Sequence, residues 1–184
     1  MATSREASNR QMVKLREFST QLAQRLKDAP NKPTEPTRLA VRIGAESYLI
    51  EMALAGEIVS LPGIAPVPWT RPWYRGLANV RGRLIGVVDI MQLSGRDPLP
   101  PDQSQQVLVF GEVLGVNAGI LVSRAFGIRN LKELTLLEGE APATGLAPRA
   151  SWEHARYRDN DGLTMTELEL RELAMSPHFS AIGV

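Results

Sequence analysis

Residues 37–52 alternate between apolar and more polar side chains. Leu39, Val41 and Ile43 are each separated by one residue, and the alternation resumes at Tyr48 after a short glycine-containing turn. A period of two is typical of a strand with one buried face. The segment is therefore predicted to form a β-hairpin.

Short apolar segments continue through the rest of the chain. The segment 61–76 is rich in proline and aromatic residues, which excludes a central strand or a helix there. An apolar run at 83–90 ends in one predicted helical turn at 90–94. Further strands are predicted at 105–111, 118–124, 125–129 and 163–167, and a helix at 167–175. Many short strands with little helix are typical of small barrels or a sandwich, so the fold is predicted to be mainly β.

The N-terminal part has a different period. Five apolar residues recur at steps of three and four, which places them on one face of a helix. These residues are Met12, Leu15, Phe18, Leu22 and Leu26. The proline-containing segment 31–36 reads as a linker. We therefore expect a helix and linker at 1–36 and one domain at 37–184. The apolar stripe packs either on that domain, on a second copy by self-association, or on a partner.

The amino-acid composition excludes several classes of function. The 184 residues contain no cysteine, which excludes disulfides and thiolate chemistry and suits a reducing, cytoplasmic location. With two histidines, a multi-histidine metal site is not expected, and no apolar run is long enough for membrane insertion. Residues 37–184 carry 14 basic and 16 acidic side chains. This balance argues against nucleic acid as a partner, because phosphate contacts need a basic surface.

The chain contains no recognisable catalytic or cofactor-binding motif. It lacks the nucleophile-elbow, phosphate-loop and dinucleotide-binding patterns. His154 is a lone histidine among charged and aromatic residues, typical of a surface or packing position. Asp89 ends an apolar strand, and we expect it to cap the turn that follows rather than to act as an acid. No enzyme activity and no cofactor are therefore expected.

The segment 57–90 combines charge with apolar sequence. Glu57 and Arg81 each lie within an apolar stretch, where a charge is costly to bury unless it is paired. We expect these two residues to form an ion pair. Trp69, Trp73 and Tyr74 lie in the loop between them, and they serve either as interface anchors or in core packing.

These residues follow a known order. The chain has Glu57-Ile58, then Pro66-Val67-Pro68, then the pattern R-G-x-x-N-x-R-G, and finally Val88-Asp89. The five fixed positions of that pattern are Arg75-Gly76, Asn79 and Arg81-Gly82. This sequence resembles the CheW-like domain of bacterial chemosensory coupling proteins, and its N-terminal helix and Trp-rich loop are most similar to the PilI branch of type IV pilus systems. It departs from the family at Gly86, where proline is usual, and at Ser123, where an acidic residue is usual.

The resemblance implies a fold of two intertwined, five-stranded antiparallel β-barrels with a short C-terminal helix. It also implies a non-enzymatic adaptor, recruited to membrane-associated arrays, that couples a methyl-accepting chemoreceptor to a CheA-like histidine kinase and controls twitching motility. A flagellar array, an enzyme with an unrecognised site and a nucleic-acid-binding barrel are the alternatives. The implied partner-binding residues are Glu57, Arg75, Gly76, Asn79, Val80, Arg81 and Gly82.

The N-terminal stripe leads to a testable prediction. An isolated helix of this length is marginal in water, so another surface must cover its apolar face. The linker favours docking within the same chain, because it raises the effective concentration. Deleting residues 1–36 should lower the melting temperature and expose apolar surface to a dye, while receptor binding survives. A truncated protein that melts at the same temperature but loses a partner would assign the helix to an interface instead.

Overall fold

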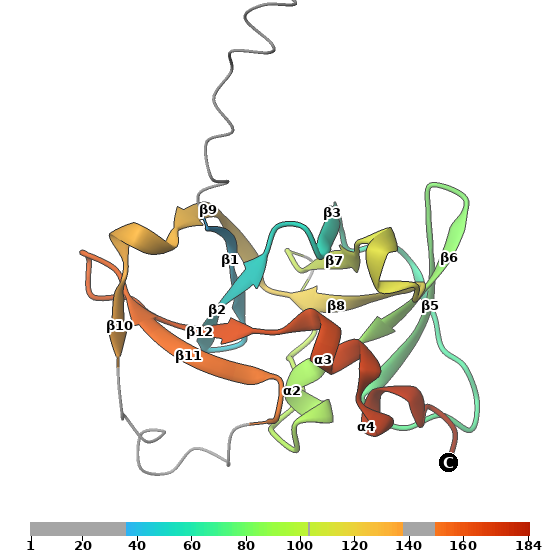
Figure 1. Ribbon diagram of the computed structural model, residues 1–184. Coiled ribbons are helices and arrows are strands. Elements are labelled where there is room, and N and C mark those ends of the chain that lie inside the picture. Colours follow the sequence, from blue (N-terminus) through green and yellow to red (C-terminus); the bar gives the residue numbers. More distant parts are fainter. Residues whose placement is uncertain (1–35, 103, 138–149) are drawn as a thin grey trace, which may run out of the picture. The chain divides into compact units, whose positions relative to one another are not determined.

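The computed structural model describes residues 36–102, 104–137 and 150–184, and their strands form two six-stranded sheets (Figure 1). The predicted N-terminal helix lies outside the described residues. Sheet A has the strand order β10-β11-β12-β2-β1-β9, and sheet B has the order β3-β7-β8-β6-β5-β4. The strands of sheet A are β1 (Thr37–Ile43), β2 (Glu46–Glu51), β9 (Arg124–Asn130), β10 (Thr135–Leu137), β11 (Glu153–Arg158) and β12 (Thr164–Leu168). The strands of sheet B are β3 (Ala55–Ser60), β4 (Ile64–Ala65), β5 (Tyr74–Val80), β6 (Arg83–Val88), β7 (Gln106–Phe110) and β8 (Ala118–Val122).

Each sheet is rolled, because its two edge strands follow one another in the chain. In a flat sheet of six strands the edges lie about 24 Å apart, at about 4.8 Å per spacing. The chain from Ser60 at the end of β3 to Ile64 at the start of β4 can span at most about 14 Å. The edges of sheet A, β9 and β10, are joined by the short helix η2 (Leu131–Glu133), within at most about 18 Å. Both sheets therefore curl toward closed barrels.

The expected five antiparallel strands per barrel need correction. Each sheet has six strands, and one pair in each is parallel, namely β12 with β2 and β6 with β8. A parallel pair needs a crossover connection, and between β6 and β8 the chain supplies α2 (Ile90–Leu93) and then β7. The two-residue strand β4 comes from the proline-rich loop, where a short edge strand tolerates neighbouring prolines.

Several elements agree with the sequence pattern. The hairpin at 37–52 is β1 and β2, the helical turn after Asp89 is α2, and the strands expected at 105–111, 118–124, 125–129 and 163–167 are β7, β8, β9 and β12. The helix expected at 167–175 begins later, as α3 (Leu170–Met175), because Leu168 still pairs in β12 and the Glu169 side chain caps the helix. The pattern did not indicate β3, β4, β5, β10 or β11, and the internal strand β5 begins at Tyr74, within the proline-rich segment where no central strand was expected.

A shared hydrophobic core joins the two sheets. One face of β1 contributes Leu39, Val41 and Ile43 to a buried cluster that also contains residues of β6, β7 and β8. The C-terminal helices α3 and α4 (Pro177–Ser180) pack on the same cluster, where Phe179 stacks on Phe110 at a ring distance of 5.8 Å. Along the chain, β1 and β2 belong to sheet A, β3 to β8 form sheet B, and β9 to β12 return to sheet A (Figure 1). The C-terminal helices then pack on the shared core.

A buried ionic cluster also connects the two sheets. Arg96 follows α2, and its guanidinium binds both carboxylate oxygens of Glu153 on β11, at 2.8 and 2.7 Å. The same guanidinium donates to the hydroxyl of Tyr48 on β2 at 2.8 Å and lies 3.3 Å from the carboxylate of Glu46. Only 3% of the Glu153 side chain and 11% of the Arg96 side chain are exposed. The paired hydrogen bonds compensate the opposite charges of Arg96 and Glu153, which would otherwise be costly to bury away from water.

The protonation of the cluster follows from its surroundings. Burial and the adjacent Glu153 raise the pKa of the Tyr48 hydroxyl above its usual range, so it stays protonated and can donate to a carboxylate. Burial alone would lower the pKa of Arg96, but its hydrogen bonds to Glu153 and the surrounding negative charge raise it. The arginine therefore remains charged.

Removing Arg96 should destabilise the protein strongly. Arg96→Ala leaves the carboxylate of Glu153 buried without its partner, and breaking such a pair costs about 3–5 kcal/mol. Arg83→Ala is the matched control, because Arg83 also pairs with a glutamate but at the surface, where such a pair is worth about 0–1 kcal/mol. Urea unfolding at neutral pH measures both. Adding Glu153→Gln to Arg96→Ala should recover part of the loss, and equal losses for the two arginines would contradict the assignment.

Candidate partner-binding site

The R-G-x-x-N-x-R-G motif forms the hairpin of β5 and β6. Val80 pairs with Arg83, which leaves Arg81 and Gly82 as a two-residue turn. Both have a positive φ, 52° and 84°, as the type I′ turn that fits the twist of a hairpin requires. The side-chain oxygen of Asn79 accepts a hydrogen bond from the Gly82 N–H at 2.9 Å. The motif therefore encodes a defined turn rather than a loose loop.

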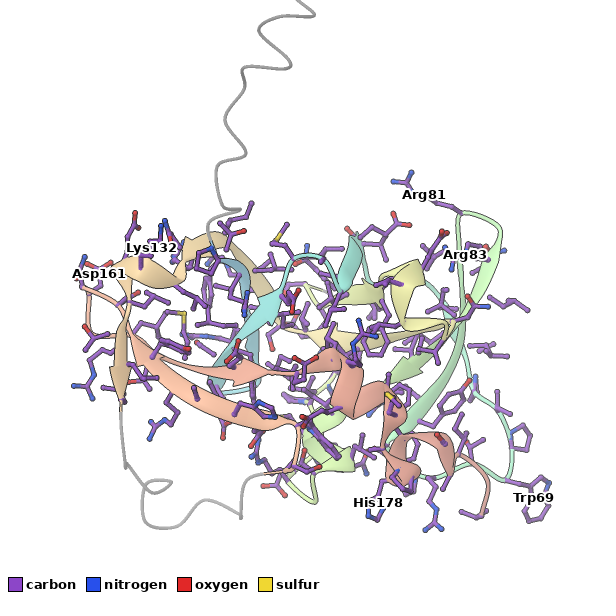
Figure 2. The ribbon with its side chains drawn as sticks, viewed as in Figure 1. Trp69, Arg81, Arg83, Lys132, Asp161 and His178 are labelled. Carbon is purple, nitrogen blue, oxygen red and sulfur yellow. The ribbon has the colours of Figure 1, made fainter. Side chains whose placement is uncertain are left out.

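Arg81 and Glu57 form the expected ion pair. The Nε of Arg81 lies 2.8 Å from Oε2 of Glu57 on β3, although β3 is not a neighbour of β5 or β6 in the strand order of sheet B. Figure 2 shows Arg81 at the tip of the hairpin, directed away from the body of the domain. Its side chain is 80% exposed and that of Glu57 is 37% exposed. An exposed pair contributes about 0–1 kcal/mol to stability, so these charges are available for recognition.

Arg75 and Asp89 lie at the opposite end of the hairpin, where β5 begins and β6 ends. Six residues of a strand span about 20 Å, so Arg75 and Arg81 cannot touch one compact group together. Arg75 is partly exposed, borders an open cavity of about 360 Å³ with Leu61 and Ile64, and has Nη1 3.8 Å from Oδ2 of Asp89. The motif therefore supplies two separate surfaces, the charged tip of the hairpin around Arg81 and the base of the hairpin around Arg75.

Asp89 has the capping role expected from the sequence. Its fully buried carboxylate accepts hydrogen bonds from the N–H groups of Met91 and Gln92 in α2, and from the N–H of Leu99 at 2.9 Å. Three backbone donors and the nearby Arg75 compensate the burial of its charge. The carboxylate therefore positions α2 and the loop after it.

Two residues of the motif have structural positions. The side chain of Val80 is buried in the shared core. Gly76 is buried beneath β4 with a φ of 131°, and a Cβ there would collide with the carbonyl oxygen of Ala65. These residues support the hairpin from within. The tip residues Glu57, Asn79, Arg81 and Gly82 are those that the fold brings together at the surface.

The aromatic residues of the loop differ in burial, and the sequence left open whether they anchor an interface or pack in the core. Trp73 is buried in the core and contacts Tyr74 edge-on, with ring centroids 6.4 Å apart. Trp69 is 85% exposed. Sequence reasoning missed Arg83, whose guanidinium bonds the side chains of Glu112 and Asn117 at 3.1 and 3.0 Å. No local pattern indicates this pairing, because its partners lie about 30 residues away.

The site offers charges and hydrogen-bonding groups for recognition. Within the described ranges, no group of three or more histidine, aspartate or glutamate side chains is arranged to hold a metal ion. Over the same residues, none of the helices has the length and apolar character needed to cross a membrane.

Comparison with known proteins identifies the family. The model of the CheW-like domain matches residues 38–165, which is most of the chain. The chain belongs to the CheW-like domain family. It is 32% identical to protein PilI of Pseudomonas aeruginosa over 104 residues, covering 56% of this chain and 58% of PilI. It is 29% identical to chemotaxis protein CheW of Thermotoga maritima over 95 residues, covering 52% of this chain and 62% of that protein.

A solved structure shows the same fold. The scaffolding protein TtCheW of Thermoanaerobacter tengcongensis superposes with a TM-score of 0.62, covering 79% of this chain and 96% of that one, at 17% sequence identity. Both departures from the usual CheW-like pattern have local contacts. A Cβ at Gly86 would lie 3.0 Å from the ring of Tyr74, and the hydroxyl of Ser123 accepts a hydrogen bond from the Gly44 N–H at 3.1 Å. Each departure therefore accompanies a contact within this domain.

The two motif glycines should differ in their tolerance of a side chain. Gly82→Ala places a Cβ in open space and costs about 1–2 kcal/mol for the left-handed backbone. Gly76→Ala adds a collision with the backbone of β4 to the strained φ, so it should lower the free energy of unfolding further. Thermal and denaturant unfolding of the two variants measures this difference. Equal losses would mean that β4 moves aside readily and does not restrain the hairpin.

Proposed function

We propose that this protein is a non-enzymatic adaptor that couples a chemoreceptor to a CheA-like histidine kinase. Membership of the CheW-like family supports an adaptor role, and TtCheW is described as a scaffolding protein. The observation that carries the proposal is the exposed hairpin tip, where a turn of defined geometry presents Arg81 beside Glu57 of β3. A turn of defined backbone geometry is suited to recognition, because little backbone flexibility is lost on binding.

The hairpin tip is the proposed receptor-contacting surface. Glu57, Asn79, Arg81 and Gly82 contact the cytoplasmic tip of a methyl-accepting chemoreceptor, and the backbone of Gly82 permits close approach because no side chain covers it. Gly76 and Val80 act in this site as supports. Arg75 contributes a second contact at the base of the hairpin, from the edge of its open cavity.

The proposed cellular role is in a type IV pilus system that controls twitching motility. The 32% identity to PilI over 104 residues supports this assignment. The identity to chemotaxis protein CheW supports the second candidate, a coupling protein of a flagellar array. In either role the protein acts in the cytoplasm at membrane-associated receptor arrays and needs no cofactor. Co-purification followed by identification of the bound kinase distinguishes the two candidates.

Reversing the charge at the tip tests the proposal. Arg81→Glu breaks the exposed pair with Glu57, so it should weaken receptor binding at least about tenfold, with a change in unfolding free energy below about 1 kcal/mol. Arg83→Glu is the matched control, because it makes the same charge change two residues away on the other side of the turn and should leave receptor binding nearly unchanged. Isothermal titration with a receptor cytoplasmic fragment measures both affinities.

The opposite variant adds a second criterion. Glu57→Arg should also weaken the receptor complex. The double variant Glu57→Arg/Arg81→Glu should not recover receptor affinity, because it restores the ion pair but exchanges the positions of the two charges. Unchanged receptor affinity in Arg81→Glu and Glu57→Arg would show that the tip is not the contact surface.

A further inference from the structure

Trp69 is an exposed tryptophan held in an unusual backbone conformation. Its side chain is 85% exposed, and its backbone φ is +61°, a left-handed value that residues other than glycine rarely adopt. Figure 2 shows Trp69 projecting from the domain. A large apolar side chain kept in solvent on a strained backbone points to a binding role, because packing within this domain does not account for it.

The C-terminal tail holds this loop in place. The N–H of Val184 donates to the carbonyl of Trp69 at 3.1 Å, and the N–H of Arg71 donates to the carbonyl of Ile182 at 2.8 Å. Between these bonds Thr70 pairs with Gly183 as an isolated β-bridge. Backbone hydrogen bonds on both sides of Thr70 fix the loop, so Trp69 is presented rather than free to fold back.

An apolar pocket lies beside the same tail. It has a volume of about 360 Å³, within the range of roughly 300–1,000 Å³ typical of ligand clefts. Its lining is mainly apolar, with three polar side chains, those of Tyr74, Asn117 and Ser180, whose oxygens can accept the indole N–H. The lining includes Leu77, Leu84, Val116, Asn117, Ser180 and Ile182. Ile182 therefore belongs both to the pocket wall and to the tail that holds the Trp69 loop.

We propose that the occupant of this pocket is Trp69 of a second copy of the same chain. The exposed Trp69 side chain, called the knob below, and the pocket are adjacent on one molecule. Two copies related by a twofold axis can therefore each place a tryptophan in the pocket of the other. A buried aromatic anchor in an apolar pocket is the kind of contact that dominates interface energy, and the indole N–H finds an oxygen of Asn117 or Ser180. The pocket wall reaches the hairpin through Leu84, which pairs with Asn79, whereas Trp69 comes from the loop before β5. The inference does not depend on the proposed adaptor function.

The three tryptophans of the chain supply a direct measurement. Trp73 and Trp152 are 8% and 5% exposed, so acrylamide quenching of fluorescence reports mainly on Trp69. Over a micromolar-to-millimolar concentration series of the full-length chain, quenching should fall and the emission should shift to the blue as pairs form. Sedimentation equilibrium on the same samples should show dimers.

Two variants and a control separate the knob from the pocket. Trp69→Ser removes the knob, and Leu84→Glu places a charge at an exposed position of the pocket wall, so each should raise the dissociation constant at least about tenfold. Val113→Glu adds the same charge to an equally exposed apolar residue outside the pocket lining and should leave association unchanged.

Mixing the two variants gives the decisive test. Trp69→Ser keeps an open pocket and Leu84→Glu keeps the knob, so a mixture should protect Trp69 from acrylamide although neither variant does so alone. A chain that stays monomeric with Trp69 fully quenchable overturns the proposal. Association that survives Trp69→Ser, or protection of Trp69 only after a receptor or kinase fragment is added, overturns it as well.

Discussion

The buried contact between Arg96 and Glu153 determines how the two sheets of this domain meet. Arg96 comes from the loop after α2, next to sheet B, whereas Glu153, Tyr48 and Glu46 belong to sheet A. An apolar core alone tolerates sliding between its layers, but a bidentate ion pair has one geometry. Because Asp89 fixes both the start of α2 and the N–H of Leu99, the position of Arg96 follows from the end of β6.

The same rigidity extends to the β5–β6 hairpin. Val80 is anchored in the core, Gly76 lies against β4, and Asn79 closes the turn. The tip of the hairpin is exposed to solvent, and its ion pair adds little to stability. The domain therefore separates two tasks. Buried groups hold the frame, while the exposed groups of the tip cost little to rearrange, which suits the proposed role in recognition.

The parts that sequence analysis predicted correctly depend on near neighbours. The β1–β2 hairpin and the α2 turn follow from alternation and from a capping carboxylate, and the pairing of Glu57 with Arg81 followed from charges in apolar surroundings. The strand β11 was missed because its sequence is dominated by charged and polar side chains, and most of these lie at least partly exposed. A strand that turns much of its surface to solvent carries no hydrophobic period from which it can be recognised.

The sequence by itself determined the family motif, the local turns and the mainly β character, because each depends on residues within a few positions of one another. Tertiary structure alone decided which motif residues reach the surface. Arg75 and Arg81 are close in sequence but lie at opposite ends of a strand, and Trp69 and Trp73 are close in sequence but differ completely in burial. Burial and long-range pairing depend on which distant segments pack together, and neither composition nor periodicity records that contact.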